Sequence, residues 1–252
     1  MSAGLSLRNL ALVGSLSPIA VPLFDDFNRA DSTDLGVTSV GGAEWQELVG
    51  AWEIFNNRIR STSGTNPLAV VDAGTADVDI SLDVSSTGRD AIIFRCSDAN
   101  NWLRLSNYYT SSYSCASTWR HQVCFNQSGT DQTTVSGCGF CPSCPSGYPV
   151  DGGCSFGSGC NCSTTHTRRV YLHKMENGTL TTPHASSYSV STTSKLRVVA
   201  NGDQVSIYSG TGTNLVATVT QTFNQAAELH GVGRSQLGNT GTAMDNFDLT
   251  PA

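Results

Sequence analysis

The sequence predicts an all-β fold, and three observations lead to this prediction. Charged residues make up only 13% of the 252 residues, and glycine occurs 25 times. Serine and threonine fill the segments between the apolar runs. These runs are short and separated by turn residues, and no long stretch has helical periodicity. Chains of this length commonly form one β-sandwich, so we expect one main domain over residues 23–250.

The two ends of this domain are predicted to pair. Residues 24–32 have the pattern of a short strand that leads into a polar turn, and residues 244–249 have that of another short strand. Chain ends often lie close together in compact domains. We therefore expect these two strands to be neighbours in one antiparallel sheet.

Two tryptophans follow the first strand. Trp45 and Trp52 flank Val49-Gly50-Ala51, which predicts a hairpin turn at Gly50. Because tryptophan strongly favours buried contacts, both rings are expected in the core, with sugar binding as the alternative.

Residues 76–84 carry the clearest strand pattern. Val78, Ile80, Leu82 and Val84 alternate with polar residues and should face the core. Asp77, Asp79 and Asp83 should then form a solvent-exposed face. One cation could bind them only with help from a neighbouring loop, so we interpret them as a solubilising face.

Further short strands are expected through the rest of the chain. The apolar runs lie at residues 91–96, 101–105, 169–174, 179–181, 195–200, 204–208, 215–219 and 229–233. Asn177-Gly178 and Asn201-Gly202 predict two hairpin turns. Cys96 has the parity of Ile92 and Phe94 and should be a small apolar core residue. So many short strands indicate a sandwich of two sheets.

The order of these segments resembles that of a known family. An opening DDFNRADSTDLG at residues 25–36 is followed by Trp45, by Trp52-Glu53-Ile54 with Asn56-Asn57, and by a closing DNFDL at residues 245–249. This order is similar to the concanavalin A-like (lectin/glucanase, laminin-G-like) jelly rolls of bacteriophage tail and virion proteins and of secreted bacterial proteins. The resemblance implies a jelly-roll sandwich of two antiparallel sheets.

A cysteine-rich insertion, residues 110–167, interrupts this pattern. It holds eight of the nine cysteines: Cys115, Cys124, Cys138, Cys141, Cys144, Cys154, Cys160 and Cys162. The segment is too poor in apolar residues to fold by burial alone, so cross-links are expected. Four disulfides of undetermined pairing are one alternative, and zinc bound by these cysteines with His121 or His166 is the other. We favour disulfides, because the spacing fits no standard zinc module, and they would indicate an oxidising, extracellular setting. The insertion would form a stiffened loop that contacts a neighbour or a surface, or would be purely architectural.

Residues 1–22 are expected to form an extended arm. Their apolar run is too short to span a membrane, and Pro18 and Pro22 interrupt a signal-peptide pattern. An apolar arm without a partner would remain exposed to water. The arm therefore predicts contacts with other virion subunits in an oligomeric assembly, and cleavage as a signal peptide is the alternative.

Several classes of function lack support in the sequence. The net charge of −6 argues against a nucleic-acid partner, because phosphate binding needs clustered Lys and Arg. The nearest carboxylate pair, Glu44 and Glu47, would point to opposite faces of one strand and could not flank one glycosidic bond. The carboxylate motif of jelly-roll glucanases, HExxH and a Walker loop are all absent from the sequence. We therefore expect a protein that is not an enzyme.

Two binding sites are predicted. Asp98, Asn100 and Asn101 could hold a glycan by polar groups, with Trp102 or Tyr108 beneath the sugar ring. The family resemblance implies calcium near the paired chain ends, where Asp26 and Asp245 would supply oxygen ligands.

The preferred hypothesis for function is a non-enzymatic virion structural protein. It would be a bacteriophage tail or capsid-surface component whose lectin-like sandwich decorates the particle or binds host-surface glycans. The alternatives are a secreted bacterial carbohydrate-binding module or glycoside hydrolase, and a zinc-bearing interaction module.

Overall fold

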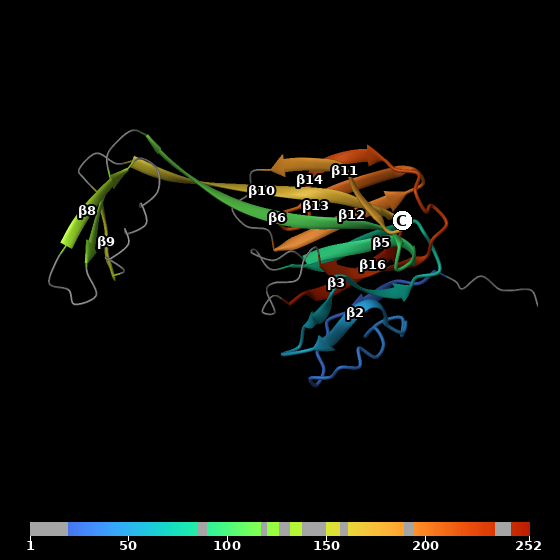
Figure 1. Ribbon diagram of the computed structural model, residues 1–252. Helices are drawn as coiled ribbons and strands as arrows, with labels where there is room; N and C mark the ends of the chain where they lie inside the picture. Colours follow the sequence, from blue (N-terminus) through green and yellow to red (C-terminus); the bar gives the residue numbers. More distant parts are fainter. Residues whose placement is uncertain are drawn as a thin grey trace, which may run out of the picture. The chain divides into compact units, whose positions relative to one another are not determined.

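The structure is a computed structural model (Figure 1). It describes residues 20–84, 90–116, 120–125, 132–137, 150–156, 161–188, 194–234 and 243–252, and for residues 108–168 and 187–188 it describes the backbone alone. These residues form strands, turns and loops, and none of them lies in a helix. A helix able to cross a membrane is therefore also absent from this part of the chain.

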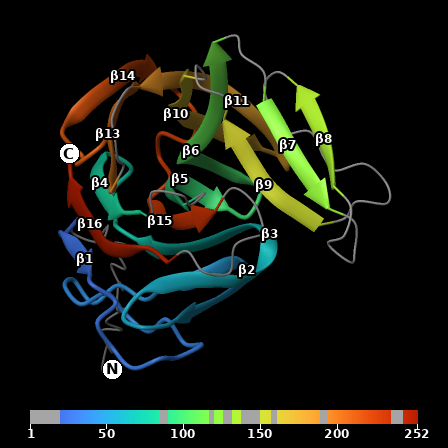
Figure 2. The same ribbon diagram turned by 90° about the vertical axis from the view of Figure 1, so that its left-hand side faces the viewer.

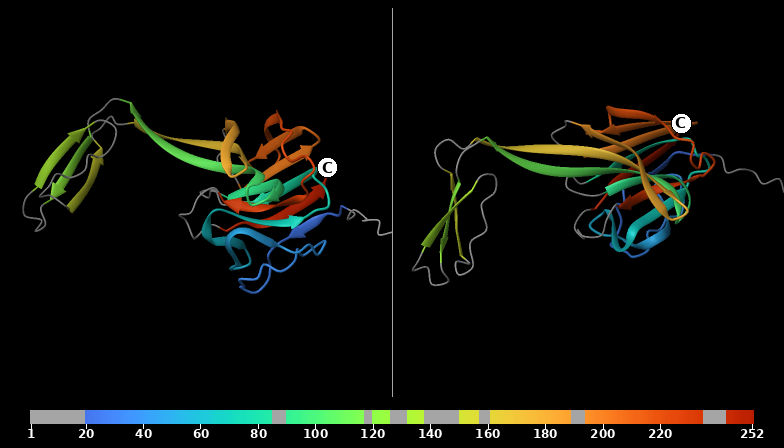
Figure 3. Two further views of the ribbon diagram at one scale, coloured as in Figure 1. Left: turned by 45° about the vertical axis from the view of Figure 1, so that its right-hand side comes forward. Right: turned by 45° about the horizontal axis from the view of Figure 1, so that its top comes forward.

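The chain divides into two compact units. The first comprises Met1–Asn107, Val170–Ser186 and Val190–Ala252, and the second comprises Tyr108–Arg169 with Ser187–Ser189. The long strands β6 and β10 contribute residues to both units and run side by side, as both views in Figure 3 show.

A six-stranded antiparallel sheet forms one layer of the first unit. Its order is β1-β16-β4-β12-β13-β14. The strands are β1 (Leu23–Asp25), β4 (Val78–Asp83), β12 (Lys195–Asn201), β13 (Gln204–Ser209), β14 (Asn214–Thr220) and β16 (Asp245–Pro251). Figure 2 shows β1 beside β16. In the register of this pair, Leu23 lies opposite Leu249. The predicted pairing of the two chain ends is therefore confirmed.

A seven-stranded antiparallel sheet forms the other layer. Its order is β11-β10-β6-β5-β15-β3-β2. The strands are β2 (Gln46–Ile54), β3 (Ile59–Asp72), β5 (Asp90–Asp98), β6 (Asn101–Ala116), β10 (Asn161–Glu176), β11 (Thr179–Tyr188) and β15 (Leu229–Arg234). The two sheets confirm the predicted all-β jelly-roll sandwich.

The sandwich core lies between these sheets. On the six-stranded sheet, Ile80 lies opposite both Val198 and Leu249, and all three are fully buried. On the seven-stranded sheet, Val232 pairs with Ile92 and Ala69, which are also fully buried. Strand β5 contacts both β4 and β12 across the core. Alternation along each strand thus places one apolar face of each sheet inside, as the sequence predicts.

A second apolar cluster lies on the opposite face of the seven-stranded sheet. It consists of Leu68, Val70, Ile93, Cys96, Trp102 and Met175, with Leu48, Val49 and Leu229 packed against them. Cys96 is buried as predicted and its thiol is free. It packs with Ile93 rather than on the face of Ile92 and Phe94, because the register between β5 and β15 shifts between Ile93 and Cys96. Burial raises the pKa of this thiol to about 12, so the group is inert at neutral pH.

The hairpin predicted at Gly50 is wrong. Residues 46–54 form one strand, β2, and its register with β3 shifts three times along its length. Gly50 has φ +77° within this strand. The chain instead reverses at Asn56-Asn57, where both residues have positive φ and Phe55 N–H donates to Arg58 O. Gly50 thus marks an irregularity inside a strand, which composition alone does not distinguish from a turn. Both tryptophans are buried as predicted.

The second unit contains a three-stranded antiparallel sheet in the order β8-β7-β9. The strands are β7 (Arg120–Phe125), β8 (Gln132–Gly137) and β9 (Val150–Phe156). The whole of the predicted insertion, residues 110–167, falls in this unit, and its strands are not predicted from the sequence.

The predictions for the cysteines and for the arm are not tested by this structure. Cys138, Cys141, Cys144 and Cys160 lie outside the described residues. The other four cysteines lie in strands whose backbone alone is described, and so does His121. The disulfide and zinc hypotheses therefore stay predictions. Of the arm, residues 20–22 alone are described.

Candidate functional site

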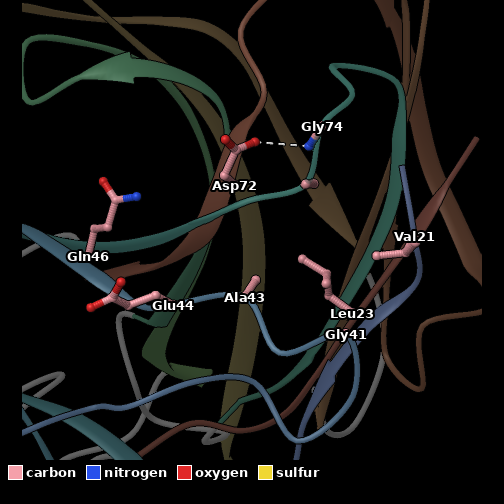
Figure 4. Close-up of a pocket in the computed structure, with 9 residues that line it drawn as sticks. Val21, Leu23, Gly41, Ala43, Glu44, Gln46, Asp72 and Gly74 are labelled. Carbon is pink, nitrogen blue, oxygen red and sulfur yellow. Dashed lines mark hydrogen bonds between the residues drawn. The ribbon is translucent and has the colours of Figure 1, made fainter. Parts of the chain in front are cut away.

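A pocket of about 290 Å³ opens in the first unit, where β1 of one sheet lies near β2 and β3 of the other. Figure 4 shows its lining, which comes from both sheets and from the loop between β1 and β2. The lining residues are Val21, Leu23, Gly41, Ala43, Glu44, Gln46, Asp72, Ala73 and Gly74. We call this the rim pocket.

A small hairpin loop builds one wall of the rim pocket. Val37 bridges Glu44, and Thr38 N–H donates to Ala43 O over 2.9 Å. Gly41 at its tip has φ +86°, and a Cβ there would lie 2.3 Å from Leu23 Cδ2. Glycine at this position therefore lets the loop pack directly on β1.

Trp45 orients the polar residues on either side of it. The Trp45 ring is buried, 5.7 Å from the Phe27 ring and 5.3 Å from the Phe247 ring. Successive side chains of an extended chain point to opposite sides, so Glu44 and Gln46 point away from the core. Both are exposed and line the rim pocket.

Buried Asp25 fixes this arrangement. Its carboxylate is fully buried and accepts a hydrogen bond from Trp45 Nε1–H over 2.8 Å. It also accepts two hydrogen bonds from the Arg29 guanidinium, over 2.8 and 3.0 Å, and one from Phe27 N–H over 2.9 Å. This role is not predicted from the sequence, although an aspartate four residues before an arginine is a signal for such an ion pair. Asp25 joins β1 to Trp45 and thereby positions the pocket wall.

The two carboxylates of the rim pocket differ in their contacts. Asp72, at the end of β3, accepts a hydrogen bond from Gly74 N–H over 2.9 Å, which Figure 4 shows as a dashed line. Glu44 and Gln46 lie together on another side of the pocket in that view. Within the described part of the chain, neither the Glu44 nor the Gln46 side chain has a hydrogen bond or an ion pair. Their acceptor atoms are therefore available to a ligand.

The pocket combines an apolar floor with hydrogen-bond acceptors. Leu23 is 1% exposed and forms the floor with Ala43. None of the described residues in the lining is a Lys or an Arg. Its volume lies near the lower end of ligand pockets, which span roughly 300–1,000 Å³. Such a pocket can pack against the C–H groups of one ring and accept hydrogen bonds from its hydroxyl groups.

Glu47 does not take part in the rim pocket. Its Oε2 accepts a hydrogen bond from Trp52 N–H over 3.0 Å, within β2. Glu44 and Glu47 therefore have separate surroundings: Glu44 lines the pocket, and Glu47 supports the irregular strand.

The predicted glycan residues Asp98, Asn100 and Asn101 form the turn between β5 and β6. The Asp98 carboxylate accepts hydrogen bonds from Asn100 N–H over 2.7 Å and from the Asn101 side-chain amide over 3.0 Å, which lower its pKa. Asn101 Oδ1 accepts one from Asn177 N–H over 3.0 Å. These polar groups tie two turns together, and none of them lines the rim pocket.

The predicted role of Trp102 beneath a sugar ring does not fit the structure. The Trp102 ring is fully buried in the second apolar cluster, and its Nε1–H donates to Ala99 O over 3.0 Å. Its parity on β6 points it to the sheet face that Leu48 and Val49 cover. The Tyr108 side chain lies outside the described atoms, so its role stays a prediction.

The predicted calcium ligands Asp26 and Asp245 each contact other groups of the protein, and calcium binding by them stays a prediction. Asp26 accepts hydrogen bonds from Asn28 N–H and Ser39 Oγ–H, which lower its pKa. Burial raises the pKa of Asp245, whose carboxylate lies 3.8 Å from the Arg58 guanidinium. Calcium takes about six to eight oxygen ligands. Within the described ranges, no group of three His, Cys, Asp or Glu side chains is placed to hold a metal ion.

A second hollow, of about 250 Å³, lies on the six-stranded sheet and differs in its charges. Its Arg197 donates two hydrogen bonds to Asp79, over 2.7 and 2.6 Å, and stacks on Tyr208. Its Lys195 lies 3.1 Å from Asp83. Asp79 and Asp83 are thus the partners of these cations rather than the purely solvated face that the sequence predicts.

The comparisons with known proteins complete this description. No protein-family model matches the chain, and no curated protein matches it. The carbohydrate-binding module CBM66 from Bacillus subtilis is a similar solved structure, with 12% identity, a TM-score of 0.42, and coverage of 80% of this chain and 91% of that one.

Two further similar structures come from enzymes. LamAcat from Zobellia galactanivorans has 9% identity, a TM-score of 0.34, and coverage of 94% and 97%. The kappa-carrageenase from Pseudoalteromonas carrageenovora, in complex with an oligotetrasaccharide of kappa-carrageenan, has 10% identity, a TM-score of 0.31, and coverage of 97% and 99%. Similarity at these TM-scores carries no information about the activity of this chain.

Proposed function

We propose that this chain is a non-catalytic saccharide-binding β-sandwich and that the rim pocket receives one sugar ring. The unengaged acceptors of Glu44 and Gln46 above the apolar floor support this proposal. Sugar hydroxyl groups are donors that such acceptors can bind, and hydrogen bonds to a carboxylate are stronger than those to neutral groups.

The charge of the rim pocket favours particular saccharides. Glu44 and Asp72 carry negative charge, and no Lys or Arg is among the described residues that line the pocket. Neutral or amine-bearing sugars therefore fit this lining, whereas uronic acids and sulfated sugars would be repelled. Because both carboxylates are exposed, added salt should weaken this discrimination.

The alternative function is glycoside hydrolysis. Hydrolysis needs two carboxylates on either side of one bond, one as acid and the other as base or nucleophile. Glu44 and Asp72 are the two carboxylates that line the rim pocket and would have to fill these roles. Measured cleavage of a polysaccharide by the purified chain, lost in both Glu44→Gln and Asp72→Asn, would establish this alternative and overturn the non-catalytic proposal.

The biological setting belongs to the same proposal. The resemblance to phage jelly rolls supports a virion tail or capsid-surface component that binds host glycans, and secretion from a bacterium is the alternative. The intact mass of the protein from its native source separates them. A complete N-terminus supports the virion component, and loss of residues 1–22 supports export. A mass lower by about eight hydrogens would indicate four disulfides.

A binding experiment tests the role of the rim pocket. We expect a glycan array to give ligands among neutral or amine-bearing saccharides, and calorimetry to show about tenfold or greater loss of affinity in Glu44→Ala. Glu176→Ala is the matched control, because Glu176 is an exposed carboxylate outside the pocket. Absence of saccharide binding, or equal affinity of the two variants, would overturn the proposal.

A further inference from the structure

The two sheets of the first unit end in four edge strands: β1, β14, β11 and β2. An edge strand presents main-chain N–H and C=O groups that can pair with another strand, and proteins commonly block such edges. The four edges of this sandwich differ in how they are blocked.

The chain itself covers the edge of β1. Phe24 N–H donates to Val40 O over 3.3 Å, and Val40 N–H donates to Phe24 O over 2.9 Å. The strand is also only three residues long. A second strand therefore finds no free edge there.

The edges of β2 and β11 are blocked in other ways. Ser32 exchanges two main-chain hydrogen bonds with Ile54 at one end of β2, and Glu47 takes the Trp52 N–H. Three register shifts also make β2 irregular. Strand β11 contains Pro183, which has no N–H to offer.

Strand β14 has an open edge. Gln221 N–H donates to Asp203 O, just beyond the paired residues of β13 and β14. Hydrogen-bonded pairs alternate in an antiparallel ladder, so Val219 bonds to β13 while Thr218 and Thr220 direct their N–H and C=O groups to the other side. Among the described residues, no strand pairs with that side.

The side chains of β14 do not discourage pairing. Its sequence, NLVATVT, contains no charged residue and no proline. Leu215 is 58% exposed, more than any other large apolar side chain in the described ranges. A register shift lies near Leu215, so the regular part of the edge runs from Ala217 to Thr220.

We propose that β14 pairs antiparallel with β14 of a second copy of this chain, which joins the two six-stranded sheets into one continuous sheet. A two-fold axis places the same strand on both sides of the contact, and two-fold dimers are the commonest assemblies. A strand that faces its own copy must avoid like charges, and β14 carries none. The dimer does not depend on saccharide binding.

Light scattering after size exclusion tests this inference on the full chain. We expect twice the monomer mass of 26.6 kDa at high concentration. Thr218→Pro should raise the dissociation constant for the dimer by about tenfold or more. Proline lacks the outward N–H, and the two-fold symmetry makes this loss occur in both copies. Thr218→Ala is the matched control: it loses the same contact with Ser206 Oγ but keeps the N–H, and should remain dimeric.

Amide hydrogen exchange identifies the interface. The Thr220 amide should exchange slowly in the dimer and become fast in Thr218→Pro. A monomer at all concentrations, open-ended aggregation, or a dimer that Thr218→Pro leaves intact would each overturn the inference. A monomer with a protected Thr220 amide would also overturn it, because another segment of the same chain would then cover β14.

Discussion

Asp25 and Glu44 flank the same tryptophan and have opposite surroundings. Asp25 lies on the buried side of Trp45 and accepts hydrogen bonds from four residues. Glu44 lies on the exposed side and, within the described part of the chain, has no hydrogen bond. Polar groups that have hydrogen-bond partners within the protein stabilise this fold, whereas polar groups without such partners can be used for binding.

The largest effect is expected for Asp25→Ala. The substitution leaves the Arg29 guanidinium and Trp45 N–H without their buried acceptor, so the free energy of unfolding should fall by about 3–5 kcal/mol. Urea denaturation measures this loss. Asp26→Ala, at the exposed neighbouring position, is the control and should cost much less. Equal losses in the two variants would contradict the structural role of Asp25.

The next effect is a pH dependence from buried His230. Its Nδ1 accepts from Arg95 N–H and its Nε2–H donates to Thr75 O, and burial lowers its pKa to about 4 from 6.5. Folding therefore favours the neutral ring. Its contribution is complete above pH 6.5 and is lost as the pH falls towards 4, with a slope of about 1 kcal/mol per pH unit.

Denaturation midpoints between pH 4 and 7 measure this slope. His184→Gln is the control, because His184 is only half-buried and bonds to Ser186 within its own strand. His184→Gln should keep the slope, whereas His230→Gln should remove the part that His230 contributes. A similar part should remain, because burial also lowers the pKa of His173 to about 4. A pH-independent stability in the unmodified chain would show that His230 does not behave as a buried neutral group.

Gly41→Ala should have an intermediate effect on stability. The new Cβ would meet Leu23 Cδ2 at 2.3 Å and Pro22 O at 3.0 Å, at a residue with positive φ. We expect a loss of about 1–3 kcal/mol. Gly42→Ala also has positive φ but adds a Cβ in open space, so it should cost about 1 kcal/mol. Thermal unfolding separates the two, and a larger loss in Gly42→Ala would contradict the close packing of the loop on β1.

The smallest effect on stability is expected for Glu44→Ala. Exposed residues without partners change the free energy of unfolding by about 0.5 kcal/mol or less. The same variant should lose saccharide affinity, which makes it the counterpart of Asp25→Ala. Urea denaturation measures the stability of this variant, and calorimetry measures its saccharide affinity. A large loss of stability would show that the Glu44 side chain has a stabilising contact in the folded protein.

Local sequence patterns predicted much of the fold. The alternation of Val78, Ile80 and Leu82 predicts a half-buried strand, because side chains of a strand point to opposite faces in turn. Asn177-Gly178 correctly predicts a hairpin, since both residues have the positive φ that this turn requires. Gly50 led to a wrong hairpin prediction, because a glycine with positive φ is found in strand irregularities as well as in turns.

The rim pocket was less accessible to prediction. The sequence pairs Glu44 with Glu47, whereas in the structure Glu44 lines the pocket together with Asp72. The register between β2 and β3 and the packing of Gly41 on Leu23 create this pocket. No pattern in the sequence specifies contacts between these distant segments. Trp102 shows the same limit, since its burial depends on Leu48 and Val49 of another strand.

The sequence by itself determined many strands of the sandwich, the turn at Asn177-Gly178 and the pairing of the two chain ends, because these follow from side-chain alternation and from residues that favour particular φ angles. The tertiary structure alone decided which polar groups are engaged. Asp25 meets Trp45, and His230 meets Arg95, only when separate strands pack together. Burial and partners, rather than residue type, therefore separate the carboxylate that stabilises this protein from the one that is free to bind.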